Sequence, residues 1–289
     1  MSDHDDAGDD AAPFDLVARL GSDFAPRLAS GLALGAVAAL FTFSGVLPFS
    51  VLVVVVTLLL SWEWGRLVHG READMVVAIH VSSAGAAAVL AALGYVGLGL
   101  LALPIGAILA MLLSLGRNSL FSALGVFYAG LPAVAMIWLR ADPQLGLLAV
   151  IFVIVIVIVS DTAGFLAGRL LNGPKLWPRL SPNKTWAGVI GALVASSIIG
   201  ALFWFVVPGA SAVWLAATSM VLSLAAQAGD LAESAIKRRF GAKDSSSLIP
   251  GHGGVMDRVD GLVAAAALVG LATFVINVHS PAHALLIGP

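Results

Sequence analysis

Long, uninterrupted apolar segments dominate the sequence and restrict most strongly how the chain can fold. A membrane-spanning helix needs roughly 20 apolar residues to cross about 30 Å of hydrocarbon. The segments are continuous rather than alternating, which favours helices over a β-barrel, and a helix satisfies its own backbone hydrogen bonds in lipid. We therefore predict an all-α integral membrane protein with about nine transmembrane helices. The predicted spans are about 28–46, 48–65, 75–93, 95–114, 119–139, 145–161, 187–207, 211–229 and 261–279.

The charge content of the sequence supports this fold class and excludes several kinds of site. Charged residues make up 11% of the 289-residue chain and its mean hydropathy is +1.00, whereas about 25% of the residues in a soluble domain are charged. The chain has no cysteine, which excludes disulfides, thiolate metal sites and cysteine nucleophiles. The net charge of −2 says little about partners. We expect the lipid bilayer as a partner and no nucleic acid.

The basic residues between the apolar segments predict how the chain is oriented. With the N-terminus in the cytoplasm, fourteen of the fifteen Lys and Arg residues lie on the cytoplasmic side, and Arg140 alone lies outside. Nine spans then put the C-terminus outside, in a multi-pass protein of the cell (inner) membrane. We expect three regions: an acidic disordered cytoplasmic tail, spans one to five, and a C-terminal catalytic region. Their bounds are 1–26, 27–140 and 141–289.

Two long polar segments, 161–186 and 230–260, fall on the cytoplasmic side and carry acids at the ends of the spans. Acids at a membrane boundary are costly without a partner and are candidates for function. Carboxylates that converge at one depth suit Mg²⁺. In the simpler alternative, the acids before the ninth span only stabilise a helix N-terminus. The four acids are Asp161, Asp230, Asp257 and Asp260.

Basic residues, serines and glycines accompany these acids, as the phosphates of a nucleotide and their metal require. Asp230, Glu233 and Lys237 fall at helical spacing, so we expect the eighth span to extend into the cytoplasm with one polar face. The motif PGHGG (250–254) has glycines that let backbone N–H groups approach an anion. Each feature alone has a simpler explanation. The basic residues could mark only the cytoplasmic side of the membrane, PGHGG could be only a turn, and SPNKT could be only a capped helix start. The other candidate residues are Arg169, Lys175, Ser181, Asn183, Lys184, Thr185, Arg238, Arg239, Lys243 and His252.

Twelve residues in the second polar segment form the pattern S-x-x-K-R-x(4)-K-D-…-P-x-H-G-G-x-x-D-R-x-D. They are Ser234, Lys237, Arg238, Lys243, Asp244, Pro250, His252, Gly253, Gly254, Asp257, Arg258 and Asp260. This pattern resembles the signature of the phosphatidate cytidylyltransferase (CDP-diacylglycerol synthase) family. SDTAGFLAGRLLNGPKLWPRLSPNKTWAG and GVFYAGLPAVAMIWLR are similar to two further regions of that family. Asn183, Ala187 and Ser247 depart from its usual residues, which affects substrate details rather than the reaction.

The resemblance implies a reaction of CTP with phosphatidic acid that gives CDP-diacylglycerol and pyrophosphate. It implies Mg²⁺ as the cofactor; a second cation and a homodimer are left open. The implied metal ligands are Asp230 and Asp257, supported by Asp260 and Asp161. The residues expected to act in catalysis are Lys237, Arg238, Lys243, Asp244, His252 and Arg258. Those expected to bind substrate are Ser181, Lys184, Thr185, Ser234, Gly253 and Gly254.

Two other classes of membrane protein would share parts of this pattern. A polyprenol kinase that uses CTP would have similar cytoplasmic loops but should lack the twelve-residue signature. A transporter would need acids near the middle of its spans, whereas this chain carries its acids at span ends. The sequence therefore favours the cytidylyltransferase hypothesis over both alternatives.

Overall fold

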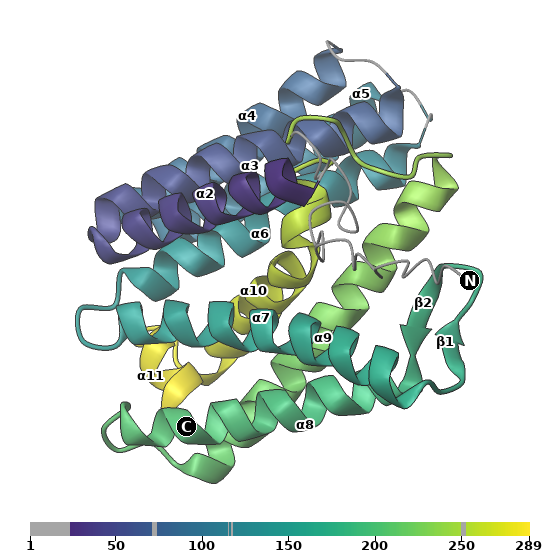
Figure 1. Ribbon diagram of the computed structural model, residues 1–289. Helices are drawn as coiled ribbons and strands as arrows, with labels where there is room; N and C mark the ends of the chain where they lie inside the picture. The colour runs from purple at the N-terminus through teal and green to yellow at the C-terminus, as the bar shows by residue number, and fades with distance from the viewer. Residues whose placement is uncertain (1–23, 71–73, 115, 117, 250–252) are drawn as a thin grey trace, which may run out of the picture.

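Helices account for most of the described chain, and many of them lie side by side (Figure 1). The computed structural model describes residues 24–70, 74–114, 116, 118–249 and 253–289. A small antiparallel sheet of β1 (Lys175–Trp177) and β2 (Ser181–Thr185) connects α7 to α8. The helices are α2 (Phe24–Phe43), α3 (Val46–His69), α4 (Met75–Ala92), α5 (Val96–Leu113), α6 (Ser119–Arg140), α7 (Gly146–Leu171), α8 (Trp186–Leu202), α9 (Ala212–Arg239), α10 (Met256–Ile276) and α11 (Pro281–Leu286).

The predicted all-α membrane fold is confirmed. Among the described residues, eight helices, α3 to α10, are long and apolar enough to cross a membrane. They correspond to the second to ninth predicted spans. Helix α2 covers the first predicted span, but its described apolar part, Gly31–Phe43, is shorter than a full span. The described chain thus has eight full spans where about nine were expected.

The helices that carry the acids continue beyond the apolar segments. Helix α9 runs to Arg239, as its polar face predicted, but α7 also continues to Leu171 and α10 already begins at Met256. Outside the hydrocarbon these ends need no apolar side chains, and Ala, Leu, Lys and Arg are good helix formers. The candidate acids therefore lie within helices rather than in loops, which fixes their positions more firmly than the sequence indicated.

Helix α10 lies between two groups of helices that pack among themselves. Helices α3 to α6 form one group and α7 to α9 the other, and α10 contacts both α6 and α9 (Figure 1). Small residues let these helices approach closely, as is typical in membranes. A Cβ atom at Gly229 would lie 2.5 Å from Cβ of Ala264 and 2.8 Å from the carbonyl oxygen of Asp260. Glycine at position 229 thus brings α9 against α10 directly beside Asp230.

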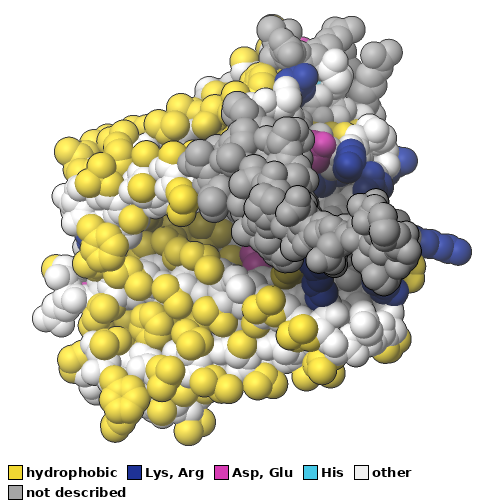
Figure 2. Space-filling view, in the orientation of Figure 1, with side chains coloured by type: hydrophobic (Ala, Val, Ile, Leu, Met, Phe, Trp, Pro, Cys, Tyr) yellow, Lys and Arg dark blue, Asp and Glu magenta, His cyan; other side chains and the backbone are white. Residues whose placement is uncertain are grey.

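The surface divides into an apolar part and a polar end (Figure 2). Hydrophobic side chains cover the left and lower parts of this face. Leu101 and Val213 are two of the many exposed apolar residues of the described chain. Lys and Arg side chains gather at the right-hand end, where Figure 1 shows the β hairpin and the end of α9. A soluble monomer rarely exposes so much apolar surface, so this division is typical of a protein in a bilayer.

Candidate active site

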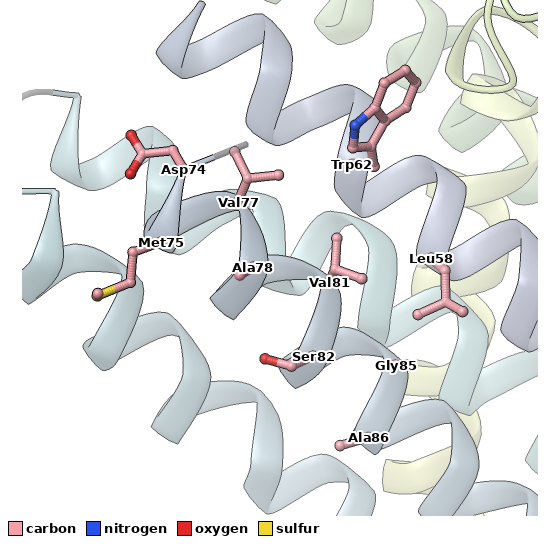
Figure 3. Close-up of a pocket in the computed structure, with 10 residues that line it drawn as sticks. All are labelled: Leu58, Trp62, Asp74, Met75, Val77, Ala78, Val81, Ser82, Gly85 and Ala86. Carbon is pink, nitrogen blue, oxygen red and sulfur yellow. The ribbon is translucent and has the colours of Figure 1, made fainter. Parts of the chain in front are cut away.

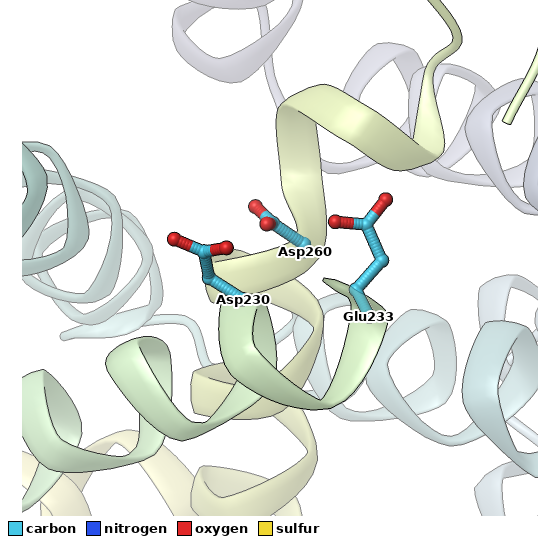
Figure 4. Close-up of side chains that lie close together, drawn as sticks. All are labelled: Asp230, Glu233 and Asp260. Atoms are coloured by element: carbon cyan, nitrogen blue, oxygen red, sulfur yellow. The ribbon is translucent and has the colours of Figure 1, made fainter. Parts of the chain in front are cut away.

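Three carboxyl groups from two helices meet where α9 crosses α10 (Figure 4). Asp230 and Glu233 lie three residues apart on the same face of α9, and Asp260 faces them from α10. One carboxylate oxygen from each of the three lies within 4.8 Å of the others. Asp230 and Asp260 were predicted from the sequence, whereas Glu233 was expected only to belong to the polar helix face. We call these three residues the acidic cluster.

The negative charge of the acidic cluster is only partly balanced by the contacts that surround it. An oxygen of Glu233 and an oxygen of Asp260 lie within 4.8 Å of each other, and two ionised carboxylates this close repel unless a proton or a cation lies between them. Lys184 Nζ is 2.6 Å from an oxygen of Asp230, and Lys237 Nζ is 3.2 Å from Glu233. The donor set is of the hard oxygen type that binds Mg²⁺.

Asp257 fixes the loop between α9 and α10 against the start of α10. The described parts of this loop are 240–249 and 253–255. Its carboxylate accepts hydrogen bonds from the backbone N–H groups of Gly254 (2.8 Å) and Ser245 (3.0 Å) and from the Ser245 hydroxyl (3.0 Å). It also pairs with Lys237 at 2.6 Å. Lys237 bridges Asp257 and Glu233, so it joins the loop to the acidic cluster. The prediction that Asp257 binds metal directly is untested.

Glu63 of α3 is a central residue of the site that the sequence reasoning missed. It is completely buried and accepts hydrogen bonds from four donors that lie 182 to 193 residues later in the sequence. They are the hydroxyls of Ser245 (3.2 Å) and Ser246 (2.5 Å) and the backbone N–H groups of Val255 (2.9 Å) and Met256 (2.7 Å). An acid inside a predicted span is a functional candidate by default, so the sequence did contain a signal for Glu63.

Gly254 is required where the loop passes between Glu63 and Asp257. A Cβ atom at this position would overlap the Ser245 hydroxyl and lie 2.5 Å from Oε1 of Glu63. Gly253, the preceding residue, has a φ of +84°, a backbone conformation that favours glycine. The two predicted glycines thus have a clear role in loop geometry, and binding of a phosphate by their backbone stays a prediction.

A cavity of about 560 Å³ opens beside the acidic cluster and brings the two polar segments together. Asp161 lines it from α7, Ser181 and Lys184 from β2, and Asp230 from α9. Lys184 links β2 to α9, because its Nζ also donates a hydrogen bond to the backbone carbonyl of Gln227 (3.3 Å). The cavity therefore joins basic and acidic groups with apolar walls that include Phe165 and Val189.

The other predicted residues lie around this centre with different roles. Thr185 is buried, and its hydroxyl accepts from the backbone N–H of Gly188 at 3.1 Å, which caps α8. The Ser234 hydroxyl donates to Asp230 at 3.5 Å. Arg238 lies exposed at the end of α9 and donates to the carbonyl of Ala242. Three further predicted residues are exposed: Lys243, Asp244 and Arg258. His252 lies outside the described residues.

A second cavity, of about 650 Å³, lies between α3 and α4 (Figure 3). Leu58, Val77 and Val81 give it apolar walls, and Asp74 is the one ionisable residue among the described residues that line it. Trp62 stands at its edge on α3. The described residues that line this cavity include no cluster of acids and bases of the kind that a triphosphate and its metal require.

Comparisons with known proteins identify the family of the chain. The model of the cytidylyltransferase family matches residues 25–276. A phosphatidate cytidylyltransferase from Brucella suis is 37% identical over 251 residues, which cover 86% of this chain and 92% of that protein. Proteins of the same name from Brucella abortus (36% over 251 residues, 86% and 92%) and Staphylococcus haemolyticus (39% over 144 residues, 50% and 54%) are also similar. The resemblance seen in the sequence is confirmed: the chain belongs to the cytidylyltransferase family.

Proposed function

We propose that the chain is a nucleotidyltransferase that transfers CMP from CTP to phosphatidic acid, which gives CDP-diacylglycerol and pyrophosphate. The single observation that carries this proposal is that the acidic cluster adjoins a cavity lined by Lys184 and apolar side chains, at the polar end of a membrane bundle. Relatives that align with 86% of the chain are named phosphatidate cytidylyltransferase, which supports the same reaction.

The reaction requires charge neutralisation more than it requires a base. The phosphate monoester of the lipid has a second pKa of about 6, so it is already an anion at pH 7. Its oxygen attacks the α-phosphorus of CTP, and the bond from that phosphorus to the bridging oxygen breaks as pyrophosphate leaves. Positively charged groups and in-line positioning supply most of the catalysis in such transfers. We assign this task to Lys184, Lys237, Arg238, Lys243 and Arg258.

We further propose that Asp230, Glu233 and Asp260 hold Mg²⁺. Their hard oxygen atoms, which lie within 4.8 Å of one another, fit this ion. When bound, the ion would neutralise charge on the phosphates of CTP. Asp161, which lines the cavity with Asp230, remains a proposed supporting residue of the metal site. Asp257 would act mainly through Lys237, with which it pairs.

The substrate-binding assignments follow from the same arrangement. Lys184 would contact a phosphate of either substrate from β2, and Ser181 lines the cavity beside it. Backbone N–H groups near Gly253 would cradle the triphosphate, together with His252. The apolar walls of the cavity would admit the glycerol end of the lipid, while its acyl chains stay in the bilayer.

Labelled CTP tests the reaction and separates it from that of a kinase. Purified protein with Mg²⁺ and phosphatidic acid should move label from [α-³²P]CTP into lipid, and EDTA should stop it. Label that moves only from [γ-³²P]CTP would instead indicate a lipid kinase and would overturn the proposal. Asp260→Asn should abolish transfer, whereas Asp74→Asn, on the rim of the second cavity, should leave it unchanged.

The proposed orientation, with the N-terminus and the active site in the cytoplasm and the C-terminus outside, has a separate test. The chain lacks cysteine, so single cysteines can be introduced without background. Ser247 lies exposed in the loop beside the site, and Gln144 lies exposed between α6 and α7. A membrane-impermeant maleimide added to intact cells should label Gln144→Cys and not Ser247→Cys; the reverse pattern would invert the topology. Light scattering of the purified protein in detergent tests the homodimer that we keep as a proposal.

A further inference from the structure

Tyr128 of α6 has a buried hydroxyl group for which no hydrogen-bond partner is found among the described residues. A buried tyrosine hydroxyl usually finds a partner, because leaving it unpaired is unfavourable. The ring of Tyr128 packs against the indole of Trp64 with 4.7 Å between ring centroids. Trp64 is itself buried and fixed, since its Nε1–H donates to the carbonyl of Phe121 at 2.8 Å. The position of the tyrosine ring is therefore determined by packing.

The surroundings of this hydroxyl are acidic. Three acids stand beside residues that pack with Tyr128: Ile236 and Val259 pack against the same buried apolar cluster as Tyr128, and Met256 belongs to that cluster. Glu233 lies one turn before Ile236, and Asp257 and Asp260 directly follow Met256 and Val259. Two of these acids belong to the acidic cluster, and α6 packs directly against α10, which carries Asp260. A phenol O–H can donate to a carboxylate, which accepts through either oxygen. The unpaired donor thus lies at the edge of a group of strong acceptors.

We propose that Tyr128 is a positioning residue whose hydroxyl, unpaired among the described residues, donates a hydrogen bond to Glu233 when a divalent cation binds and thereby orients the acidic cluster for that cation. This inference deepens the proposed function and rests on it. Groups that orient the ligands of a metal ion typically change its affinity by 10- to 100-fold when they are removed. Tyr128 would act on the cation through Glu233 and would not itself touch the substrate.

The two tyrosines of the chain give a matched pair of variants. Tyr128→Phe removes only the hydroxyl and keeps the ring that packs on Trp64, while Tyr95, exposed at 58% before α5, serves as the control. Mn²⁺ alone is the probe, and the electron paramagnetic resonance signal of the free ion reports binding. We expect Tyr128→Phe to weaken Mn²⁺ binding about tenfold and Tyr95→Phe to leave it unchanged. Equal affinity in wild type and Tyr128→Phe would overturn the inference.

Kinetics and fluorine resonance complete the test. The Mg²⁺ concentration for half-maximal activity should rise by the same factor in Tyr128→Phe, while KM for CTP at saturating Mg²⁺ stays the same. Wild type with fluorotyrosine at both positions avoids any folding defect: Mg²⁺ should shift the ¹⁹F signal of Tyr128 and not that of Tyr95. An unmoved Tyr128 signal would refute the role of this residue.

The outcomes separate the inference from the proposed function. Unchanged Mn²⁺ affinity in Tyr128→Phe, with normal lipid labelling by the wild type, would overturn the inference alone. A wild type that binds Mn²⁺ through Tyr128 but forms no CDP-diacylglycerol would overturn the proposed reaction and support the inference about the cation. A wild type that binds no Mn²⁺ would overturn both.

Discussion

Replacing Glu63 with Gln should open the loop before α10 while leaving the shape of the side chain unchanged. In the native site, Oε1 accepts from Ser246 and from the N–H of Val255, and Oε2 accepts from Ser245 and from the N–H of Met256. Glutamine has one oxygen and one NH₂ group, so one of these backbone N–H groups must face a donor. The serine hydroxyl on that side can rotate and accept instead.

The magnitude follows from this count of donors. One buried backbone N–H left without an acceptor costs about 1–3 kcal/mol, and the loss of negative charge beside the N-terminus of α10 adds roughly 0.3–1 kcal/mol. Taking the first term alone, the equilibrium for opening the loop should rise about 5- to 150-fold. Global stability of the helix bundle should change far less, because the apolar packing of α3 is untouched.

Hydrogen exchange of the protein in nanodiscs measures this effect. The amides of Val255 and Met256 should exchange faster in Glu63→Gln by the factor given above, and lipid labelling should fall because Asp257 and the loop lose their shared geometry. Asp74→Asn is the control, since Asp74 precedes α4 without a side-chain capping bond. Exchange rates at residues 255 and 256 that match those of the wild type would show that Glu63 does not hold the loop.

Three further variants test other parts of the site. Lys184→Met should lower kcat/KM in the lipid-labelling assay roughly tenfold or more, because it removes a charge-assisted contact; wild-type kinetics would exclude Lys184 from phosphate binding. Thr185→Ala removes the cap on Gly188 N–H and should cost about 1 kcal/mol, seen as a lower Tm that Thr185→Ser restores. Gly254→Ala should reduce activity and loop protection because its methyl group overlaps two side chains, whereas Gly97→Ala meets open space and should be neutral; equal behaviour of the two would contradict the role assigned to Gly254.

The sequence predicted the class of fold, because the length and continuity of the apolar segments decide it. The side of the membrane on which the candidate residues gather was predicted from the Lys and Arg residues and stays a prediction. The sequence could not predict which helices are neighbours. Helices such as α4 and α5 are apolar on nearly all sides, so their sequences do not indicate a packing face. That α10 lies between α6 and α9 therefore became known only from the structure.

The candidate site shows the same limit. Asp230 and Asp260 could be chosen from the sequence because they stand where spans end. Glu233 sits on the same polar face of α9, but its closeness to Asp260 depends on how Gly229 lets α9 and α10 approach. Glu63 was missed because its hydrogen-bond donors lie far away in the sequence. The sequence near position 63 did not indicate which residues would pair with this acid.

The distance along the chain between Glu63 and its donors affects how the protein is made. The donors lie 182 to 193 residues later in the sequence, and a ribosome needs roughly 10–40 s for such a stretch at 5–20 residues per second. During that time an acid that belongs in the interior of the finished protein has none of these partners. The end of α3 that carries Glu63 can complete its packing only when α10 has entered the membrane. Among the described residues, α10 is the last full span, and its insertion brings Glu63 together with the donors that hold the loop of the candidate site.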